Sequence, residues 1–185
     1  MMRKDETGSL KQVAFTKDNP DNIKKVLALY KNILIRGVKG VGKITNTIKA
    51  LKNNTKVYYV GNPVDFEGKR RAGSYEKYLN YISSLKKDMT VVDDIQSLFK
   101  TDQKIILIID EIYGRSDTQL EQIEKLLDKE NIQIVQIVGC MKNMRNLIDK
   151  IDIVIDLHQG GALVVDKELA KAICGIFGMK PQVRA

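Results

Sequence analysis

The chain has 185 residues, of which 43% are hydrophobic and 29% charged, with a net charge of +8; this suits one domain with a sizeable core. No apolar run approaches the roughly 18 residues of a membrane helix, and the amino terminus lacks the apolar stretch of a secretory signal. One histidine and two cysteines argue against a zinc site and a disulfide framework, so a cytoplasmic protein is expected.

The predicted elements alternate between helices and strands along the chain. A polar arm covers residues 1–20, and Asp21 or Asn22 then caps a helix over 23–30. Apolar runs predict strands over 32–36, 56–60, 104–109, 132–138 and 151–157. Helical spacing predicts helices over 43–53, 74–87, 91–99, 117–129 and 144–150. Gly160 and Gly161 turn the chain into a hairpin strand, and a last helix covers 167–177.

This alternation indicates an α/β fold with a mainly parallel sheet. Uninterrupted apolar strands such as KIILII are typical of strands that helices cover on both faces. We therefore expect a three-layer α/β/α sandwich, formed by a single domain over residues 21–185 that ends in a hairpin and a helix. Because ligands of such sheets bind beyond the carboxyl ends of the strands, candidate motifs should lie there.

A glycine-rich segment follows the first of these core strands. Residues 37–43 read GVKGVGK and match the phosphate-loop pattern G-x-x-x-x-G-K-[ST] except at its last position. The glycines let consecutive N–H groups curl around one anion, the following helix adds its positive end, and the lysine reaches the terminal phosphates. The predicted nucleotide-binding residues are Gly37, Lys39, Gly40, Val41, Gly42, Lys43, Ile44 and Thr45.

Position 44 departs from the pattern, which has a Ser or Thr hydroxyl there as a ligand of Mg²⁺. Ile44 has no side-chain oxygen, and Thr45 is not expected to replace the ligand because one step along a helix rotates the side chain by about 100°. Mg²⁺ keeps several waters in its coordination shell, so a water could take the place of the hydroxyl at a cost in metal affinity or reaction rate. The alternative is that the site binds nucleotide but no longer hydrolyses it.

Asp110 and Glu111 end the apolar strand IILII, at the edge where the glycine-rich segment also opens. An aspartate there can hold hydrated Mg²⁺, and the adjacent glutamate can polarise an attacking water as a general base. An acidic pair after a strand can also be a helix cap or a solvated end. Its combination with the phosphate loop favours Asp110 as the metal ligand and Glu111 as the catalytic base.

In its phosphate loop and acidic pair the chain resembles P-loop NTPases, and Asp110-Glu111 resembles the Walker B pair of the branch with AAA+ ATPases, RecA-like motors and helicases. The resemblance implies the P-loop NTPase fold, with strand 132–138 between the phosphate-loop strand and the Asp-Glu strand. It implies ATP and Mg²⁺ as ligands. The N-K-x-D motif, with which GTPases recognise guanine, is not found in the sequence, and this argues against GTP. No AAA+ helical lid follows the last core strand, so a minimal core like those of secretion and packaging ATPases fits as well.

The resemblance also implies a polar sensor after the fourth core strand and an arginine that reaches the γ-phosphate of a neighbouring subunit. Asn143 is the first candidate sensor and Gln136 the second. Arg115 and Arg145 are the candidate arginine fingers. An ordinary polar loop and ordinary surface arginines are the alternatives.

The positive charge is concentrated at the start of the chain. The first 55 residues hold 12 Lys and Arg against 4 Asp and Glu. Lys69, Arg70 and Arg71 form a separate basic run, followed by tyrosines. Such regions predict contact with nucleic acid or an acidic partner, although a solvated face is the alternative and the spacing of Tyr78 and Tyr81 indicates core positions.

The sequence favours one function and leaves two alternatives open. The favoured function is an ATP-binding, Mg²⁺-dependent ATPase that works on a partner, nucleic acid or protein, as an oligomer of this chain. The second is a nucleotide-binding switch or structural component with weak or no hydrolysis, because Ile44 replaces the metal ligand. The third is a nucleic-acid-binding protein on a P-loop scaffold.

Overall fold

The computed structural model describes residues 13–15, 19–52, 55–62, 74–112, 115–139, 147–158 and 161–165. The strands are β1 (Val13–Phe15), β2 (Asn32–Arg36), β3 (Val57–Val60), β4 (Met89–Val91), β5 (Ile105–Asp110), β6 (Ile132–Val138), β7 (Ile153–His158) and β8 (Gly161–Val165). The helices are α1 (Asn19–Leu29), α2 (Lys43–Ala50), α3 (Ser74–Leu85), α4 (Asp117–Leu127) and the 3₁₀ helices η1 (Gln96–Lys100) and η2 (Ile148–Lys150).

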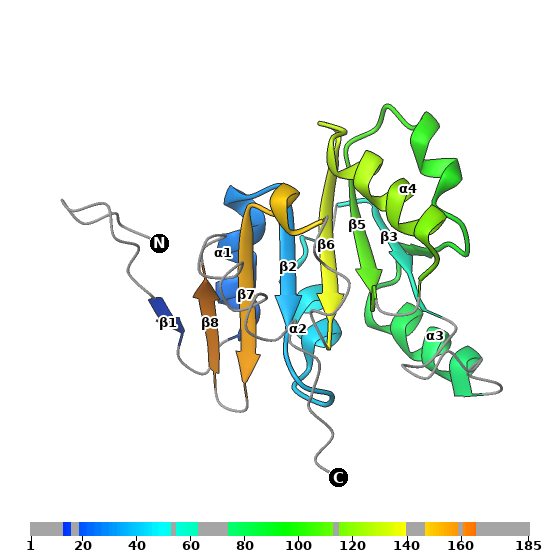
Figure 1. Cartoon of the computed structure of the whole chain (residues 1–185). Coiled ribbons are helices and arrows are strands. Elements are labelled where there is room, and N and C mark those ends of the chain that lie inside the picture. The colour runs from blue at the N-terminus through cyan, green and yellow to red at the C-terminus, as the bar shows by residue number, and fades with distance from the viewer. Residues whose placement is uncertain are drawn as a thin grey trace, which may run out of the picture.

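These strands form one sheet in the order β1-β8-β7-β2-β6-β5-β3-β4 (Figure 1). The strands from β7 across to β4 are parallel to one another. β8 returns antiparallel beside β7, as the hairpin prediction requires, and β1 pairs antiparallel with β8. The sheet is therefore mainly parallel, as predicted.

Helices cover both faces of this sheet, and Figure 1 shows α1 and α2 behind the strands with α4 in front of them. Alternate residues of β2 enter different cores: Ile33 and Ile35 pack with α1, α2 and α3, whereas Leu34 packs with α4. This confirms the three-layer α/β/α architecture. No helix in the described ranges is both long enough and apolar enough to cross a membrane.

β5 shows why the strands are apolar throughout. All six residues from Ile105 to Asp110 are buried. Each fully buried isoleucine or leucine contributes about 1.5–3 kcal/mol of transfer free energy, which fixes this strand in the middle of the sheet. The one polar residue, Asp110, stands last, so the first ionisable group of the strand appears at the carboxyl edge of the sheet.

The structure differs from the predicted elements near the amino terminus and after α3. Residues 13–15, expected in the polar arm, form β1, and α1 begins at Asn19 rather than after Asp21 or Asn22. The helix predicted over 91–99 is wrong: β4 ends at Val91 and η1 begins at Gln96. A three-residue strand is too short for a recognisable alternating pattern. The last helix, over 167–177, and residues 144–146 of another predicted helix lie outside the described residues.

β6 lies between β2 and β5, which confirms the strand order that the resemblance implied. Ile35 of β2 and Asp110 of β5 both pair with Ile137 of β6, so the three strands end at one level. Neighbouring strands are about 4.8 Å apart, which puts the segment after β2 and the acidic pair after β5 about 10 Å from each other. The fold thus brings the two predicted motifs to one edge.

Candidate nucleotide-binding site

The loop between β2 and α2 depends on three glycines with positive φ: Gly37 at 150°, Gly40 at 90° and Gly42 at 81°. Residues with a Cβ rarely adopt these conformations. Gly37 also lies against β7, where an added Cβ would come within 2.5 Å of the Leu157 carbonyl oxygen. Gly42 directly precedes α2, whose first N–H groups have no intrahelical acceptor and suit an anion.

Lys43 folds back across this loop. Its Nζ donates to the carbonyl oxygens of Gly37 at 2.7 Å and Val38 at 3.1 Å. Burial lowers the pKa of Lys43, and the carboxylates of Glu111 and Asp110 oppose that shift. The structure therefore brings the predicted lysine and the predicted acidic pair into one electrostatic neighbourhood.

The two residues after Lys43 direct their side chains away from the loop. Ile44 is partly buried and packs against the core formed with α1, α2 and α3. The Thr45 hydroxyl lies 3.2 Å from the Tyr81 hydroxyl of α3. Further along α2, the Thr47 hydroxyl donates to the Lys43 carbonyl oxygen at 2.7 Å. The hydroxyl of Thr45 therefore contacts α3, in line with the expectation that it does not replace the missing ligand.

Asp110 is 8% exposed, and two tyrosine hydroxyls donate to its Oδ2. Tyr59 of β3 lies 2.8 Å from this oxygen and Tyr78 of α3 lies 2.9 Å from it. Burial, followed by the charge of Asp110, raises the pKa of Tyr59, so its hydroxyl keeps the proton that it donates. The carboxylate thus joins β5 to both β3 and α3.

Glu111 has a strained backbone, with φ at 48°. Its N–H donates to the Ile137 carbonyl oxygen at 2.7 Å, and its Oε2 accepts the Gly139 N–H at 2.9 Å. A left-handed conformation in a residue other than glycine costs about 1–3 kcal/mol and is often found at functional sites. Here it turns the chain sharply after β5 and holds the Glu111 carboxylate at the end of β6.

A Mg²⁺ site of the implied kind does not fit the described residues. Ile44 offers no oxygen, the Thr45 hydroxyl pairs with Tyr81, and the Asp110 carboxylate holds two tyrosine hydroxyls. Mg²⁺ needs oxygen ligands in near-octahedral geometry, and here Ile44 supplies none while the Thr45 hydroxyl and Asp110 Oδ2 contact tyrosines.

Arg115, a candidate arginine finger, holds backbone groups of its own chain. Its Nε donates to the Glu111 carbonyl oxygen at 3.1 Å, and its NH2 group donates to those of Asp110 at 2.9 Å and Gly61 at 3.1 Å. It thereby ties the end of β3 to the end of β5. This arrangement favours a structural role, and the finger role remains a sequence prediction.

Gln136 does not share the face of Asp110. It pairs with Leu34 and Ile109, which belong to the core on the α4 side, whereas Tyr59 beside Asp110 belongs to the opposite core. Gln136 is fully buried, and its role as a sensor stays a prediction from the sequence. The other predicted side chains, Asn143, Arg145, Lys69, Arg70 and Arg71, lie outside the described residues.

Sequence reasoning did not identify the two tyrosines on Asp110. A signal for Tyr59 was present: it pairs with Ile108, two residues before Asp110, so strand alternation puts both side chains on one face. Tyr78 does contact the core, as its spacing indicated, but its hydroxyl position depends on how α3 packs. Tyr81 is 49% exposed rather than a core residue.

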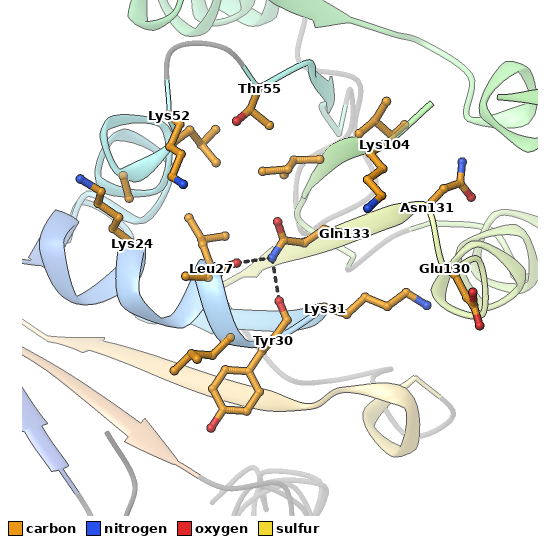
Figure 2. Close-up of a pocket in the computed structure, with 16 residues that line it drawn as sticks. Lys24, Leu27, Tyr30, Lys31, Lys52, Thr55, Lys104, Glu130, Asn131 and Gln133 are labelled. Atoms are coloured by element: carbon orange, nitrogen blue, oxygen red, sulfur yellow. Dashed lines mark hydrogen bonds between the residues drawn. The ribbon is translucent and has the colours of Figure 1, made fainter. Parts of the chain in front are cut away.

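A pocket of about 520 Å³ lies at the opposite edge of the sheet, where β2, β5 and β6 begin. Its charged lining residues are Lys24, Lys31, Lys52, Lys104 and Glu130. Figure 2 shows Gln133 in the middle of this pocket, where its amide nitrogen donates to the carbonyl oxygens of Leu27 and Tyr30, each at 2.6 Å. Part of the positive charge of the first 55 residues therefore gathers on the side away from the phosphate loop.

No known protein-family model matches the chain, and no curated protein matches its sequence. Among solved structures it is similar to EscN, the ATPase of the enteropathogenic E. coli type III secretion system, solved with its stalk EscO (TM-score 0.45, 16% identity, 74% of this chain and 45% of EscN). It is also similar to the large terminase of a thermophilic bacteriophage, solved with ADP (0.43, 10%, 78% and 45%), and to C. elegans PCH-2 (0.40, 16%, 77% and 40%). The chain spans less than half the length of these three proteins, and the similarities concern the fold alone.

We predict that Gly37→Ala destabilises the fold by about 2–4 kcal/mol, because its methyl group would meet the Leu157 carbonyl oxygen and the residue would keep a φ of 150°. Gly40→Ala is the matched control: its φ is also positive, but nothing lies within 4 Å of an added Cβ. It should cost only about 1 kcal/mol. Urea unfolding of both variants measures the difference, and equal losses would contradict the close packing of the loop on β7.

Proposed function

We propose that this chain binds ATP at its phosphate loop and acts as a nucleotide-dependent switch. The observation that carries this proposal is the position of Lys43, which begins α2 and donates to the backbone of a loop with three positive-φ glycines. The charges of Glu111 and Asp110 also act on this lysine. Glycine-rich loops that lead into a helix bind phosphate through backbone N–H groups and the positive helix end. ATP, rather than another anion, follows from the resemblance of the loop and acidic pair to P-loop ATPases.

The contacts of Lys43 explain how binding could change the loop. Its Nζ is now held by the carbonyl oxygens of Gly37 and Val38, which are neutral acceptors. A phosphate is a charged acceptor and forms hydrogen bonds about twice as strong, so Lys43 would turn from the loop to the ligand. The two carbonyl groups would then lose their donor, and the loop would rearrange around the bound nucleotide.

Three features support a switch over rapid hydrolysis. Position 44 has no hydroxyl, the Asp110 carboxylate is held by tyrosines, and the Glu111 carboxylate accepts the Gly139 N–H. A general base must reach the water that it activates. Glu111 would have to give up its contact with the end of β6 before it could do so, and that same contact could transmit nucleotide binding to the segment that follows β6.

An ATPase is the second candidate. Its support is the position of the Asp110-Glu111 pair, whose two carboxylates are the charges that act on Lys43. If the chain is an ATPase, Glu111 is the general base that polarises the attacking water. A protein partner and assembly of several copies remain predictions from the sequence.

Lys43→Ala should weaken ATP binding at least about 30-fold, since the variant loses a charge-assisted hydrogen bond to phosphate. Lys49→Ala, on the exposed side of the same helix, is the matched control and should bind like the parent chain. Isothermal titration calorimetry measures both affinities. If Lys43→Ala bound ATP as tightly as the parent, the phosphate-loop assignment would be wrong.

Phosphate release from ATP in Mg²⁺-containing buffer separates the two candidates. We expect the parent chain to release phosphate far more slowly than about 1 per second, the low end of ordinary enzymes, and Ile44→Thr to raise the rate. A parent chain that turns over well, with little change in Ile44→Thr, would establish the ATPase instead. In that case Glu111→Gln should bind ATP and stop turnover.

The lysine-lined pocket favours an additional contact with nucleic acid. Lys24, Lys31 and Lys52 come from the basic first third of the chain, and Lys104 joins them from the start of β5. Lys31 Nζ is already used by the Leu127 carbonyl oxygen, which leaves the other three as the candidate phosphate contacts. Lysines within a Debye length of about 8 Å reinforce one another as a positive surface at physiological salt.

Replacing Lys24, Lys52 and Lys104 together with alanine should reduce the salt dependence of oligonucleotide binding by about three units in slope, one for each lost phosphate contact. The control removes three exposed lysines elsewhere: Lys77, Lys87 and Lys125. Fluorescence anisotropy with labelled single- and double-stranded DNA gives the slopes. Equal losses in the two triple variants would assign the binding to general charge rather than to the pocket.

A further inference from the structure

At the carboxyl edge of the sheet, one oxygen of Asp110, Oδ2, is used to hold neighbouring elements together. The Asp110 carboxylate lies under Tyr59 and Tyr78, whose hydroxyl oxygens are 3.3 Å apart. These three side chains come from β5, β3 and α3. Moving the carboxylate toward a cation would take the acceptor from two hydroxyl groups, one of them in a side chain that is fully buried.

In the first turn of α2, the side chains of Ile44 and Thr45 also contact other parts of the protein. Ile44 packs against the core at the position where a metal-binding hydroxyl would stand. Thr45, the next hydroxyl along the helix, pairs with Tyr81 of α3. α3 thus supplies one tyrosine to Thr45 and another to Asp110, two of the side chains next to the phosphate loop that carry oxygen.

The phosphate loop offers cationic groups of the protein itself to a bound phosphate. Lys43 lies on the loop, Lys39 is exposed within it, and the start of α2 adds a partial positive charge. A bound triphosphate would therefore meet these cationic groups whether or not a metal ion accompanies it.

We infer that the phosphate loop binds ATP independently of Mg²⁺, and that Asp110 is a positioning residue that joins β5 to β3 and α3 through Tyr59 and Tyr78. This inference rests on the proposed function, since it concerns how ATP binds at the same loop. The ligand of the site is then ATP without a bound metal ion. The role of α3 is to hold the Asp110 carboxylate through Tyr78.

The test is calorimetric titration of the full chain with ATP, once in excess EDTA and once in excess MgCl₂. The two dissociation constants should agree within about threefold, a difference of less than 1 kcal/mol. Binding in Mg²⁺ alone would overturn the inference and leave the proposed function standing. Binding in neither buffer would overturn the proposed function, and the inference with it.

A substitution of Asp110 itself is the first test of its role. Asp110→Asn keeps an oxygen acceptor for the tyrosine hydroxyls, so it should fold and keep the same ratio of affinities in the two buffers. A tenfold or greater loss confined to the Mg²⁺ buffer, about 1.4 kcal/mol, would show that Asp110 serves a metal and would overturn its assignment.

Tyr59→Phe should lower the melting temperature, because the Asp110 carboxylate loses a donor. Tyr58→Phe is its control on the same strand: Tyr58 packs on the opposite core and contacts Lys56 instead. It should melt like the parent chain. Equal melting temperatures for Tyr59→Phe and the parent would contradict the structural role of the Asp110 cluster.

Discussion

The position of β6 between β2 and β5 is the constraint on which the rest of the site depends. Parallel pairing fixes the register, and Ile137 pairs with both Ile35 and Asp110. A shift by one residue would move every side chain of a strand to the other face of the sheet. The phosphate loop and the acidic pair would then no longer meet, because Asp110 would leave the face that carries α2 and α3.

Burial at this edge explains why its polar groups have so many partners. A carboxylate or guanidinium that leaves water is costly unless hydrogen bonds replace the lost hydration. Tyrosine hydroxyls donate to Asp110, the Gly139 N–H donates to Glu111, and four carbonyl groups at the strand ends accept from Arg115. These bonds link β3, β5, β6 and α3, so a change in any one of them at nucleotide binding reaches several elements.

Local patterns in the sequence were enough for the parts of the fold with strong periodicity. The apolar runs of β2, β5 and β6 and the glycines of the loop predicted the parallel sheet and the shared edge, and the resemblance supplied the strand order. β1 and β4 were missed because each has only three residues. The Tyr78 contact with Asp110 has no local signature, since it arises only when α3 packs beside β3 and β5. The positive φ of Glu111 was hidden for the same reason: a neighbouring strand imposes it through the Ile137 carbonyl group.

Ile44 shows that phosphate binding and metal binding are separable in this fold. The loop binds an anion through backbone N–H groups, its glycine conformations and Lys43, and none of these depends on the side chain at position 44. That side chain can therefore be chosen for packing, and burying an isoleucine contributes up to about 1.5–3 kcal/mol when burial is complete. With its side chain packed against the core, position 44 supplies no oxygen that could share a metal ion with Asp110. Its carboxylate is then most stable where Tyr59 and Tyr78 hold it, as the structure has it.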